Sequence, residues 1–392
     1  MKLKHTPNPN LETCLLLRFL VTRSARNGFT LLELLISMII SSIVVSTLLA
    51  LVVNILQTNQ RDASRSDTQR DMQMAMDYVA RDVQEAVYVY GVTQETNTDG
   101  TLGPKESCLF RYGDALVRGQ SSKCTGLLSF LPDFLTSPTN TPVLAFWKPE
   151  TLPSSMRTAC RGAAADVGKL PGENGFNLAL NAVPCVSQRM YTLVIYSLNT
   201  APAVGFGWKG KARITRYQLP NFTEGALVGT GINPGWAAPI AKDKRPLTWP
   251  IGNSATQTNI NIQGNAANPA ITGNVVLTDF VDDSPTTYVP SSAATGGSCP
   301  SGFDSPSGFS GARFNSAFYV CVRSGSLSAS AGANAVAVQA AAAAGQGINP
   351  EVHIVMRGNA AGRGGIPLLS GDVPFQMETR VLSRGVFGKL AN

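Results

Sequence analysis

The sequence predicts an α+β fold in which one long N-terminal helix packs on a C-terminal antiparallel β-sheet head with long loops and disulfides. Residues 29–56 form an apolar run with a single charge, and residues 57–91 contain no residue that breaks a helix before the final glycine. From residue 92 to 392, short apolar segments alternate with Gly, Pro, Asn and Thr, and charged residues make up only 15% of the chain, which favours loop-rich β structure. We therefore expect a basic leader (1–28), an apolar helix (29–56), an amphipathic helix (57–91) and a β-rich head (92–392).

The leader carries most of the positive charge of the chain. It holds five cations and one acid, a net charge of +4, so the other residues carry only +3 of the total +7. That remainder is too small to indicate nucleic-acid binding. Because cationic flanks stay on the cytoplasmic side of a membrane, residues 1–28 are expected in the cytoplasm and the head outside it.

The apolar run at 29–56 is long enough to cross a membrane. As a helix it would measure about 42 Å at 1.5 Å per residue, against a hydrocarbon core of about 30 Å. It is too long for the apolar region of a secretory signal and lacks a small-residue cleavage site after it. A buried core helix is rarely apolar on every face. Hydropathy alone therefore favours a signal anchor.

The junction between leader and helix carries the most specific signal. It reads RNGFTLLE at residues 26–33 and continues as LLISMIIS. This resembles the class III signal of type IV pilins and pseudopilins, in which a basic leader ends in Gly, Phe follows, and Glu is the fifth mature residue. The resemblance implies cleavage between Gly28 and Phe29 by a prepilin peptidase, followed by N-methylation of Phe29. A glycine there lets the backbone lie close to the catalytic groups of a peptidase.

Glu33 is the one charge in the apolar run, and a carboxylate in a membrane segment is costly. One interpretation is an interfacial acid that lipid headgroups solvate. The other is implied by the resemblance: Glu33 attracts the N-terminal amine of a neighbouring subunit as helices bundle in a filament. It would then set the register of assembly and would not be a catalyst.

Small and hydroxyl residues recur through the same helix, and two interpretations stay open. They can let neighbouring helices approach closely, or their hydroxyls can bond to the preceding turn of their own helix. The residues are Ser37, Ser41, Ser42, Ser46, Thr47 and Ala50.

The second half of the helix shows an apolar stripe at intervals of three or four, and Gly91 is the expected stop. The stripe is Met72, Met76, Val79, Val83, Ala86, Val87 and Tyr90. Residues 57–70 lack it, so they are expected in solvent or against polar neighbours. Alternating charges predict a solvated face, or else contacts between subunits. These charges are Arg61, Asp62, Arg65, Asp67, Arg70, Asp71, Arg81 and Asp82.

The head contains several segments with strand character, which predict an antiparallel sheet on the amphipathic helix. They are residues 190–198, 212–219, 274–281, 317–323, 352–357 and 375–383. The fragments ARITRYQL, VVLTDFVDD and ETRVLSRG resemble minor subunits of the PilW and PulJ type. FYVCVR with the later VMRGNA is similar to cyanobacterial pseudopilins linked to polysaccharide secretion. Residues 252–272 and 324–349 have no assignment.

The head holds six cysteines, an even number that suits an oxidising compartment. Six cysteines permit 15 connectivities, of which neighbour pairing is one. It would join Cys108 to Cys124, Cys160 to Cys185, and Cys299 to Cys321. With no CxxC spacing and one histidine beyond the leader, no metal site is expected.

Neither an enzyme nor a cofactor is predicted, because no catalytic signature is present. Three aspartates, Asp279, Asp282 and Asp283, could bind calcium, but their spacing is not that of an EF-hand. The four tryptophans, in loop-like sequence, could form a sugar-binding surface or serve in packing. They are Trp147, Trp208, Trp236 and Trp249.

Taken with the resemblance, these features predict a minor pilin or pseudopilin that primes, caps or decorates a type IV pilus-like or secretion filament. The alternative is an adhesin-like module on a pilin stalk that binds a surface or polysaccharide; a membrane-anchored enzyme comes third. The resemblance implies a single-pass inner-membrane protein with a periplasmic head, later in a cell-surface or periplasmic filament. Its partners would be prepilin peptidase, other pilin or pseudopilin subunits, an inner-membrane assembly platform and membrane lipid.

Overall fold

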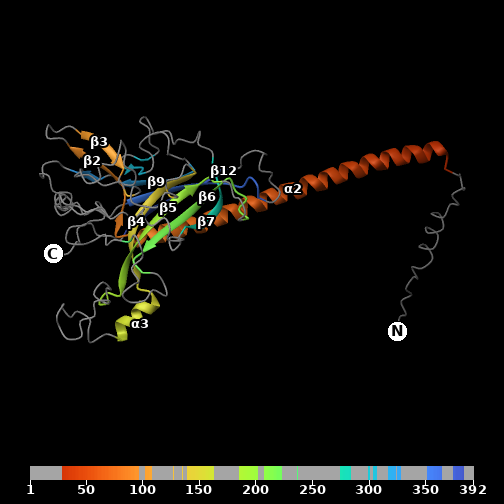
Figure 1. Ribbon diagram of the computed structural model, residues 1–392. Coiled ribbons are helices and arrows are strands. Elements are labelled where there is room, and N and C mark those ends of the chain that lie inside the picture. The colour runs from red at the N-terminus through yellow and green to blue at the C-terminus, as the bar shows by residue number, and fades with distance from the viewer. Residues whose placement is uncertain are drawn as a thin grey trace, which may run out of the picture. The chain divides into compact units, whose positions relative to one another are not determined.

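The structure is a computed structural model (Figure 1). It describes residues 29–96, 102–107, 127, 135, 139–162, 185–201, 207–222, 236, 274–283, 299–300, 303–306, 317–323, 325–327, 351–363 and 374–383. The chain divides into two compact units, of which the first is Met1–Asn59 and the second is Gln60–Asn392.

A single helix, α2 (Leu31–Gln84), covers most of both predicted helical segments. No Gly or Pro interrupts its 54 residues. In the first unit, every described side chain is exposed. In the second unit, buried positions recur at intervals of three or four, as an amphipathic helix requires. They are Ser64, Thr68, Met72, Ala75, Met76, Val79, Asp82 and Val83.

The helix ends at Gln84, so the expected stop at Gly91 was wrong. The last turn tightens as the Ala86 N–H donates to the Val83 carbonyl at 3.0 Å. The chain then extends, and the Tyr90 N–H donates to the carbonyl of Ala145 at 2.9 Å, while β1 (Tyr88–Val89) pairs with β4 (Asn140–Thr151). The run VYVY combines β-branched and aromatic residues, which prefer strands, and the edge of β4 supplies its backbone partners.

The head contains a nine-stranded sheet whose described pairs are all antiparallel. Its order is β1-β4-β5-β6-β7-β11-β9-β8. Strand β12 lies outside this order and pairs with the edge of β11 opposite to the edge that pairs with β9. The strands are β4 (Asn140–Thr151), β5 (Arg189–Asn199), β6 (Ala212–Pro220), β7 (Val275–Val281), β8 (Phe303–Asp304), β9 (Phe318–Arg323), β11 (Glu351–Asn359) and β12 (Pro374–Leu382).

Two further elements accompany this sheet. A second sheet joins β10 (Gly325–Leu327), β2 (Val92–Thr96) and β3 (Leu102–Ser107), with β10 parallel to β2. A short helix, α3 (Ser154–Gly162), follows β4. The α+β architecture predicted from the sequence is the one observed, with α2 against an antiparallel sheet.

All six predicted strands are present. Five shorter strands (β1, β2, β3, β8 and β10) were not predicted, and neither was the long strand β4. It contains two prolines, which cannot donate to a sheet ladder and therefore lower the strand signal. Pro142 lies at a register shift, and β-bulges accommodate proline. Strand β1 pairs only with Phe146 and Trp147 of β4, so it does not pair with Pro149. Trp147 consequently lies inside a strand, fully buried, and not in the loop that was expected.

The hydrophobic core lies between the stripe of α2 and one face of the nine-stranded sheet. Met72, Met76, Val79 and Val83 of the helix belong to one buried cluster with side chains from the strands. The strand residues include Phe146, Val194, Tyr196, Ile214, Val281, Val320, Val352 and Ile354. Figure 1 shows this part of α2 lying against the sheet.

Residues 57–70 of α2 are exposed to solvent except for Ser64 and Thr68, and Thr68 has a polar neighbour. The guanidinium of Arg363 donates to the Thr68 hydroxyl at 3.2 Å and to the Asp71 carboxylate at 2.7 Å. Arg363 follows β11, after Gly362 at φ 88°. A polar contact therefore extends the helix–sheet interface beyond its apolar part.

Asp82 departs from the predicted solvated face, because its side chain is buried under three strands. Its carboxylate accepts from Lys148 Nζ of β4 at 2.7 Å and from the Tyr196 hydroxyl of β5 at 2.7 Å. Arg216 Nε of β6 donates to it at 2.8 Å, and Lys148 also lies 3.0 Å from Glu150. A buried carboxylate is costly unless it is paired, and here two cations and a hydroxyl satisfy it.

The pKa values of this cluster follow its contacts. Burial raises the pKa of Asp82, but the charge of Arg216 and the hydrogen bonds from Lys148 and Tyr196 lower it more, so the pKa lies below its ordinary value. Burial lowers the pKa of Lys148, but Asp82 and Glu150 raise it more, so this pKa lies above its ordinary value. The charged forms are therefore the stable ones in the folded protein.

Asp82→Asn is expected to destabilise the head by about 3 to 5 kcal/mol, because Lys148 and Arg216 lose their shared counter-charge while still buried. Chemical denaturation of the full-length protein in detergent, followed by tryptophan fluorescence, measures this change. Asp77→Asn, at an exposed position of the same helix, is the matched control and is expected to shift stability by less than about 0.5 kcal/mol. Equal stability of the two variants would contradict the role of Asp82.

The same cluster predicts two limits on stability against pH. The depressed pKa of Asp82 contributes stability above its ordinary value of 3.8, and this is lost as pH falls through the lower folded value. The raised pKa of Lys148 contributes below 10.5 and is lost as pH rises through the higher folded value. Unfolding free energies measured across pH should show both losses, with the acid loss reduced in Asp82→Asn. If the loss of stability at acid pH were unchanged in that variant, other carboxylates would be responsible for that loss.

Candidate functional site

The N-terminus of α2 is capped by a residue that was not predicted from the sequence. The Glu33 N–H donates to the Thr30 hydroxyl at 3.3 Å and to the Thr30 carbonyl at 3.0 Å. Thr30 is therefore the N-cap, and the spacing Thr-x-x-Glu is that of a capping box, which was readable from the sequence. Glu33 lies in the first turn, where the helix dipole favours an acidic side chain.

The predicted cleavage site adjoins this cap. Phe29 is the first described residue, and its side chain is 77% exposed. Gly28 and the rest of the leader lie outside the described residues, so cleavage after Gly28 and methylation at Phe29 stay predictions. Phe29 lies two residues before the start of α2, and Glu33 lies in the first turn of that helix.

The first unit presents an apolar surface on all sides of its helix. Among the described residues, α2 is the one helix long and apolar enough to cross a membrane, with a mean hydropathy of 2.6 in its most apolar window. No residue of that window is buried. Because an exposed surface of this extent is unfavourable in water, the helix is consistent with membrane anchoring.

Four of the five hydroxyl groups named in this segment donate within their own helix. They donate to carbonyls three residues earlier, which is the second of the two interpretations left open. The bonds are Ser37 to Leu34 (2.9 Å), Ser41 to Met38 (3.1 Å), Ser42 to Ile39 (2.8 Å) and Thr47 to Val44 (2.8 Å). Their small volume is still available for close helix contacts, but their hydrogen bonding does not require a partner helix.

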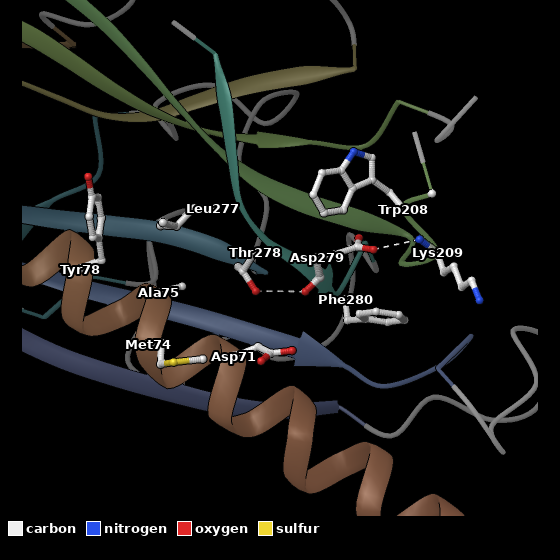
Figure 2. A pocket seen from close by; sticks show the side chains of 11 residues that line it. Asp71, Met74, Ala75, Tyr78, Trp208, Lys209, Leu277, Thr278, Asp279 and Phe280 are labelled. Carbon is white, nitrogen blue, oxygen red and sulfur yellow. Dashed lines mark hydrogen bonds between the residues drawn. The ribbon is translucent and has the colours of Figure 1, made fainter. Parts of the chain in front are cut away.

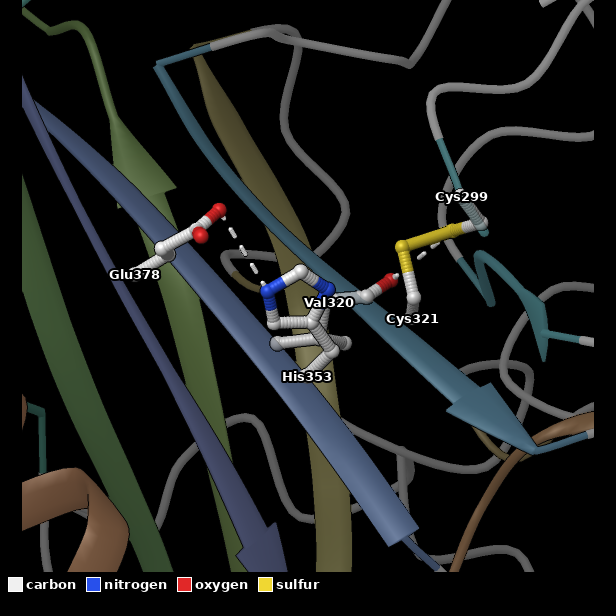
Figure 3. The surroundings of a disulfide bond; sticks show 5 residues. All are labelled: Cys299, Val320, Cys321, His353 and Glu378. Carbon is white, nitrogen blue, oxygen red and sulfur yellow. Dashed lines mark hydrogen bonds and ion pairs between the residues drawn. A yellow bond between two sulfur atoms is a disulfide. The ribbon is translucent and has the colours of Figure 1, made fainter. Parts of the chain in front are cut away.

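Two disulfides lie in the part of the head that the structure describes. Cys160 of α3 is bonded to Cys185, and Cys299 is bonded to Cys321 of β9. Figure 3 shows the second bond beside Val320, with His353 on the neighbouring β11. Each closes a loop of 22 to 25 residues, worth about 3 kcal/mol on the chain-entropy model. They are two of the three pairs that neighbour pairing gives; Cys108 and Cys124 lie outside the described residues.

The three candidate calcium ligands do not form a site. Asp279 accepts from the backbone N–H groups of Lys209 and Gly210, at 2.9 and 3.0 Å. Asp282 pairs with Arg357 at 2.8 Å, and Asp283 lies 3.6 Å from Lys211. Within the described part of the chain no cluster of three or more acidic, histidine or cysteine side chains could hold a metal ion.

The tryptophans do not share one surface. Trp147 is in the core, where its indole N–H donates to the Tyr90 hydroxyl at 3.0 Å. Trp236 donates to the Tyr191 carbonyl at 3.0 Å. Trp208 is 38% exposed and lines an open pocket of about 560 Å³ (Figure 2). Trp249 lies outside the described residues.

Comparison with known proteins identifies the motif at the junction. Residues 23–49 match the family model of the prokaryotic N-terminal methylation motif, a segment that includes Gly28, Phe29 and Glu33. No curated protein and no solved structure matches the chain. The motif, together with the long apolar N-terminal helix, supports a type IV pilin-like protein. It implies processing by a prepilin peptidase and assembly with other pilin subunits, and this family is structural, not enzymatic.

Gly28→Arg is expected to block processing, because a long side chain at the scissile residue keeps the backbone away from the peptidase. The variant should retain residues 1–28, which intact mass measurement of the membrane-extracted protein detects. Asn27→Arg adds the same charge one residue earlier and serves as the matched control; it should be cleaved. Normal processing of Gly28→Arg would rule out this cleavage site.

Proposed function

We propose that this protein is a minor pilin or pseudopilin, a structural subunit that primes, caps or decorates a type IV pilus-like or secretion filament. The observation that carries the proposal is the exposed apolar helix with the methylation motif across its capped N-terminus. Processing would release the basic leader and give this helix a new amine at Phe29. The helix would then be ready to leave the bilayer for a filament core.

The apolar surface of residues 31–56 needs an apolar partner both before and during assembly. Before assembly, lipid of the inner membrane covers it, with the head in the periplasm. During assembly, helices of other subunits replace the lipid, helped by an inner-membrane platform. Since transfer from lipid to other apolar helices gains little by the hydrophobic effect, polar interactions set the register.

Glu33 supplies that polar interaction. In an apolar bundle its carboxylate is unfavourable alone, and the amine of Phe29 from a neighbouring subunit is the group that can neutralise it. Pairing of these two groups would align each incoming helix with the one before it. The position in the first helical turn keeps the carboxylate near the level at which such an amine would enter.

The properties of the head favour a minor over a bulk subunit and a structural over a catalytic role. The head spans more than 300 residues and carries disulfides, which suits the periplasm and would be bulky at every position of a thin fibre. Its buried charges, such as Asp82, Lys148 and Arg216, are paired with one another in the helix–sheet interface and bear on stability. We therefore assign it no enzymatic activity.

A second candidate function is an adhesin-like module on a pilin stalk. The observation that favours it is the open pocket lined by Trp208, Tyr78 and Phe280 in the head. A subunit that only fills a position in a fibre does not need such a pocket.

Glu33→Gln tests the filament proposal. The variant should be processed normally but enter the sheared filament fraction at least tenfold less than the wild type, because the neutral amide cannot pair with an ammonium group. Quantitative immunoblotting of the sheared and membrane fractions measures this. Asp77→Asn, at an exposed acid of the same helix, is the matched control and should assemble normally. Normal assembly of Glu33→Gln would contradict the role given to Glu33.

A further inference from the structure

The open pocket of the head has walls from three separate segments. Helix α2 contributes Met74 and Tyr78, strand β7 contributes Leu277 and Phe280, and the segment before β6 contributes Trp208. All of them belong to the second unit. A volume of about 560 Å³ lies within the range of small-molecule sites.

Aromatic rings lie at both ends of this pocket and are partly exposed to solvent, with the Arg216 guanidinium 5.7 Å from the centroid of the Tyr78 ring. Figure 2 shows Tyr78 at one end and Trp208 at the other, with Leu277 and Thr278 between them. The side chain of Tyr78 is 45% exposed and that of Trp208 is 38% exposed. Exposed aromatic residues gathered around one cavity mark a binding surface more often than isolated ones do.

The wall that carries Trp208 is held rigidly. The carboxylate of Asp279 accepts from the N–H groups of Lys209 and Gly210, at 2.9 and 3.0 Å, and so fixes the segment to β7. Gly210 permits this approach, because a Cβ there would lie 2.3 Å from the backbone nitrogen of Phe280. These two hydrogen bonds restrain the backbone next to Trp208, and such restraint lowers the entropy lost on binding.

The position of Phe280 carries backbone strain. Its φ is 59°, a left-handed conformation that is rare for an aromatic residue and costs about 1 to 3 kcal/mol. The guanidinium of Arg363 covers its ring at 5.2 Å from the centroid. Strain of this kind persists only where the surrounding structure holds it, and it is concentrated at binding sites.

The charges at the pocket balance once Arg363 is counted with Lys209, so they favour neither an anionic nor a cationic ligand. Its lining contains two acids, Asp71 and Asp279, and one base, Lys209. Asp71 already pairs with Arg363 at 2.7 Å, yet its side chain is 41% exposed and a carboxylate can accept several hydrogen bonds. The pocket therefore offers aromatic faces and hydrogen-bond acceptors without a surplus of positive charge.

We propose that this pocket binds a neutral oligosaccharide, with sugar rings stacked on Trp208 and Tyr78. A sugar ring presents C–H groups on its faces and hydroxyl groups on its rim, which match aromatic walls and the Asp71 carboxylate, respectively. Aromatic residues at the two ends fit a chain of sugars better than a single ring. This inference rests on the second candidate function, that the head is a binding module.

A peptide segment from another subunit fits less well. An extended peptide binds a sheet by adding a strand to an open edge, whereas the lining of this pocket consists of side chains from a helix, a strand and a short connecting segment. Peptide binding is therefore an outcome of the test.

Calorimetric and tryptophan-fluorescence titrations of the full-length protein with cellotetraose, maltotetraose, mannotetraose and chitotetraose test the proposal. The protein is kept in a zwitterionic detergent that contains no sugar. At least one probe should bind saturably. Trp208→Ala should weaken binding at least tenfold, Trp208→Phe should weaken it less, and Val275→Ala, at an exposed site of β7 outside the pocket, should leave it unchanged.

Each other outcome overturns a defined part of the proposal. Saturable binding that Trp208→Ala leaves intact would overturn the pocket as the site while keeping the head as a binding module. No binding of any probe would overturn the inference and the module together. If no probe binds and Trp208→Ala lowers filament incorporation, the pocket is a contact between subunits. The filament proposal itself depends on Glu33 and is judged separately.

Discussion

The packing of the head depends on one buried carboxylate, Asp82, and on the three strands that satisfy it. Lys148, Tyr196 and Arg216 come from β4, β5 and β6, so a shift of any one strand by a residue would turn its polar group away from the helix. A carboxylate without these partners would be strongly unfavourable in the core. The cluster therefore fixes the rotation of α2 on the sheet, and with it which helix side chains enter the core and which line the pocket.

The two parts of α2 differ in the surroundings that their side chains require, although the backbone is one uninterrupted helix. Before Asn59, apolar side chains point in every direction and need lipid or other apolar helices. After Gln60, apolar side chains keep to one stripe, and the head covers it. A pilin-like subunit needs this combination, because the same helix must anchor the chain, join an assembly and support a folded head.

Much of this arrangement could be predicted from local patterns. The apolar run, the stripe and the six strands follow from the spacing of apolar residues, which depends on neighbours in the sequence. The end of the helix, strand β4 and the role of Asp82 could not be predicted in that way. Pro142 and Pro149 weaken the strand signal of β4, which is stabilised by its partner strands. The VYVY run is extended because the edge of β4 lies beside it. Asp82 resembles the solvated charges around it until the register of three distant strands is known. At the helix N-terminus, Thr30 could have been predicted as the cap from its spacing to Glu33.

The central claim is that the chain is a filament precursor whose mature form begins at Phe29. Intact mass and N-terminal sequencing of the wild-type protein, extracted from its native membrane, test it most directly. We predict a chain that lacks residues 1–28 and starts at an N-methylated Phe29. A chain that retains the leader, or is cut elsewhere, would make it an ordinary anchored or secreted protein and would remove the role assigned to Glu33.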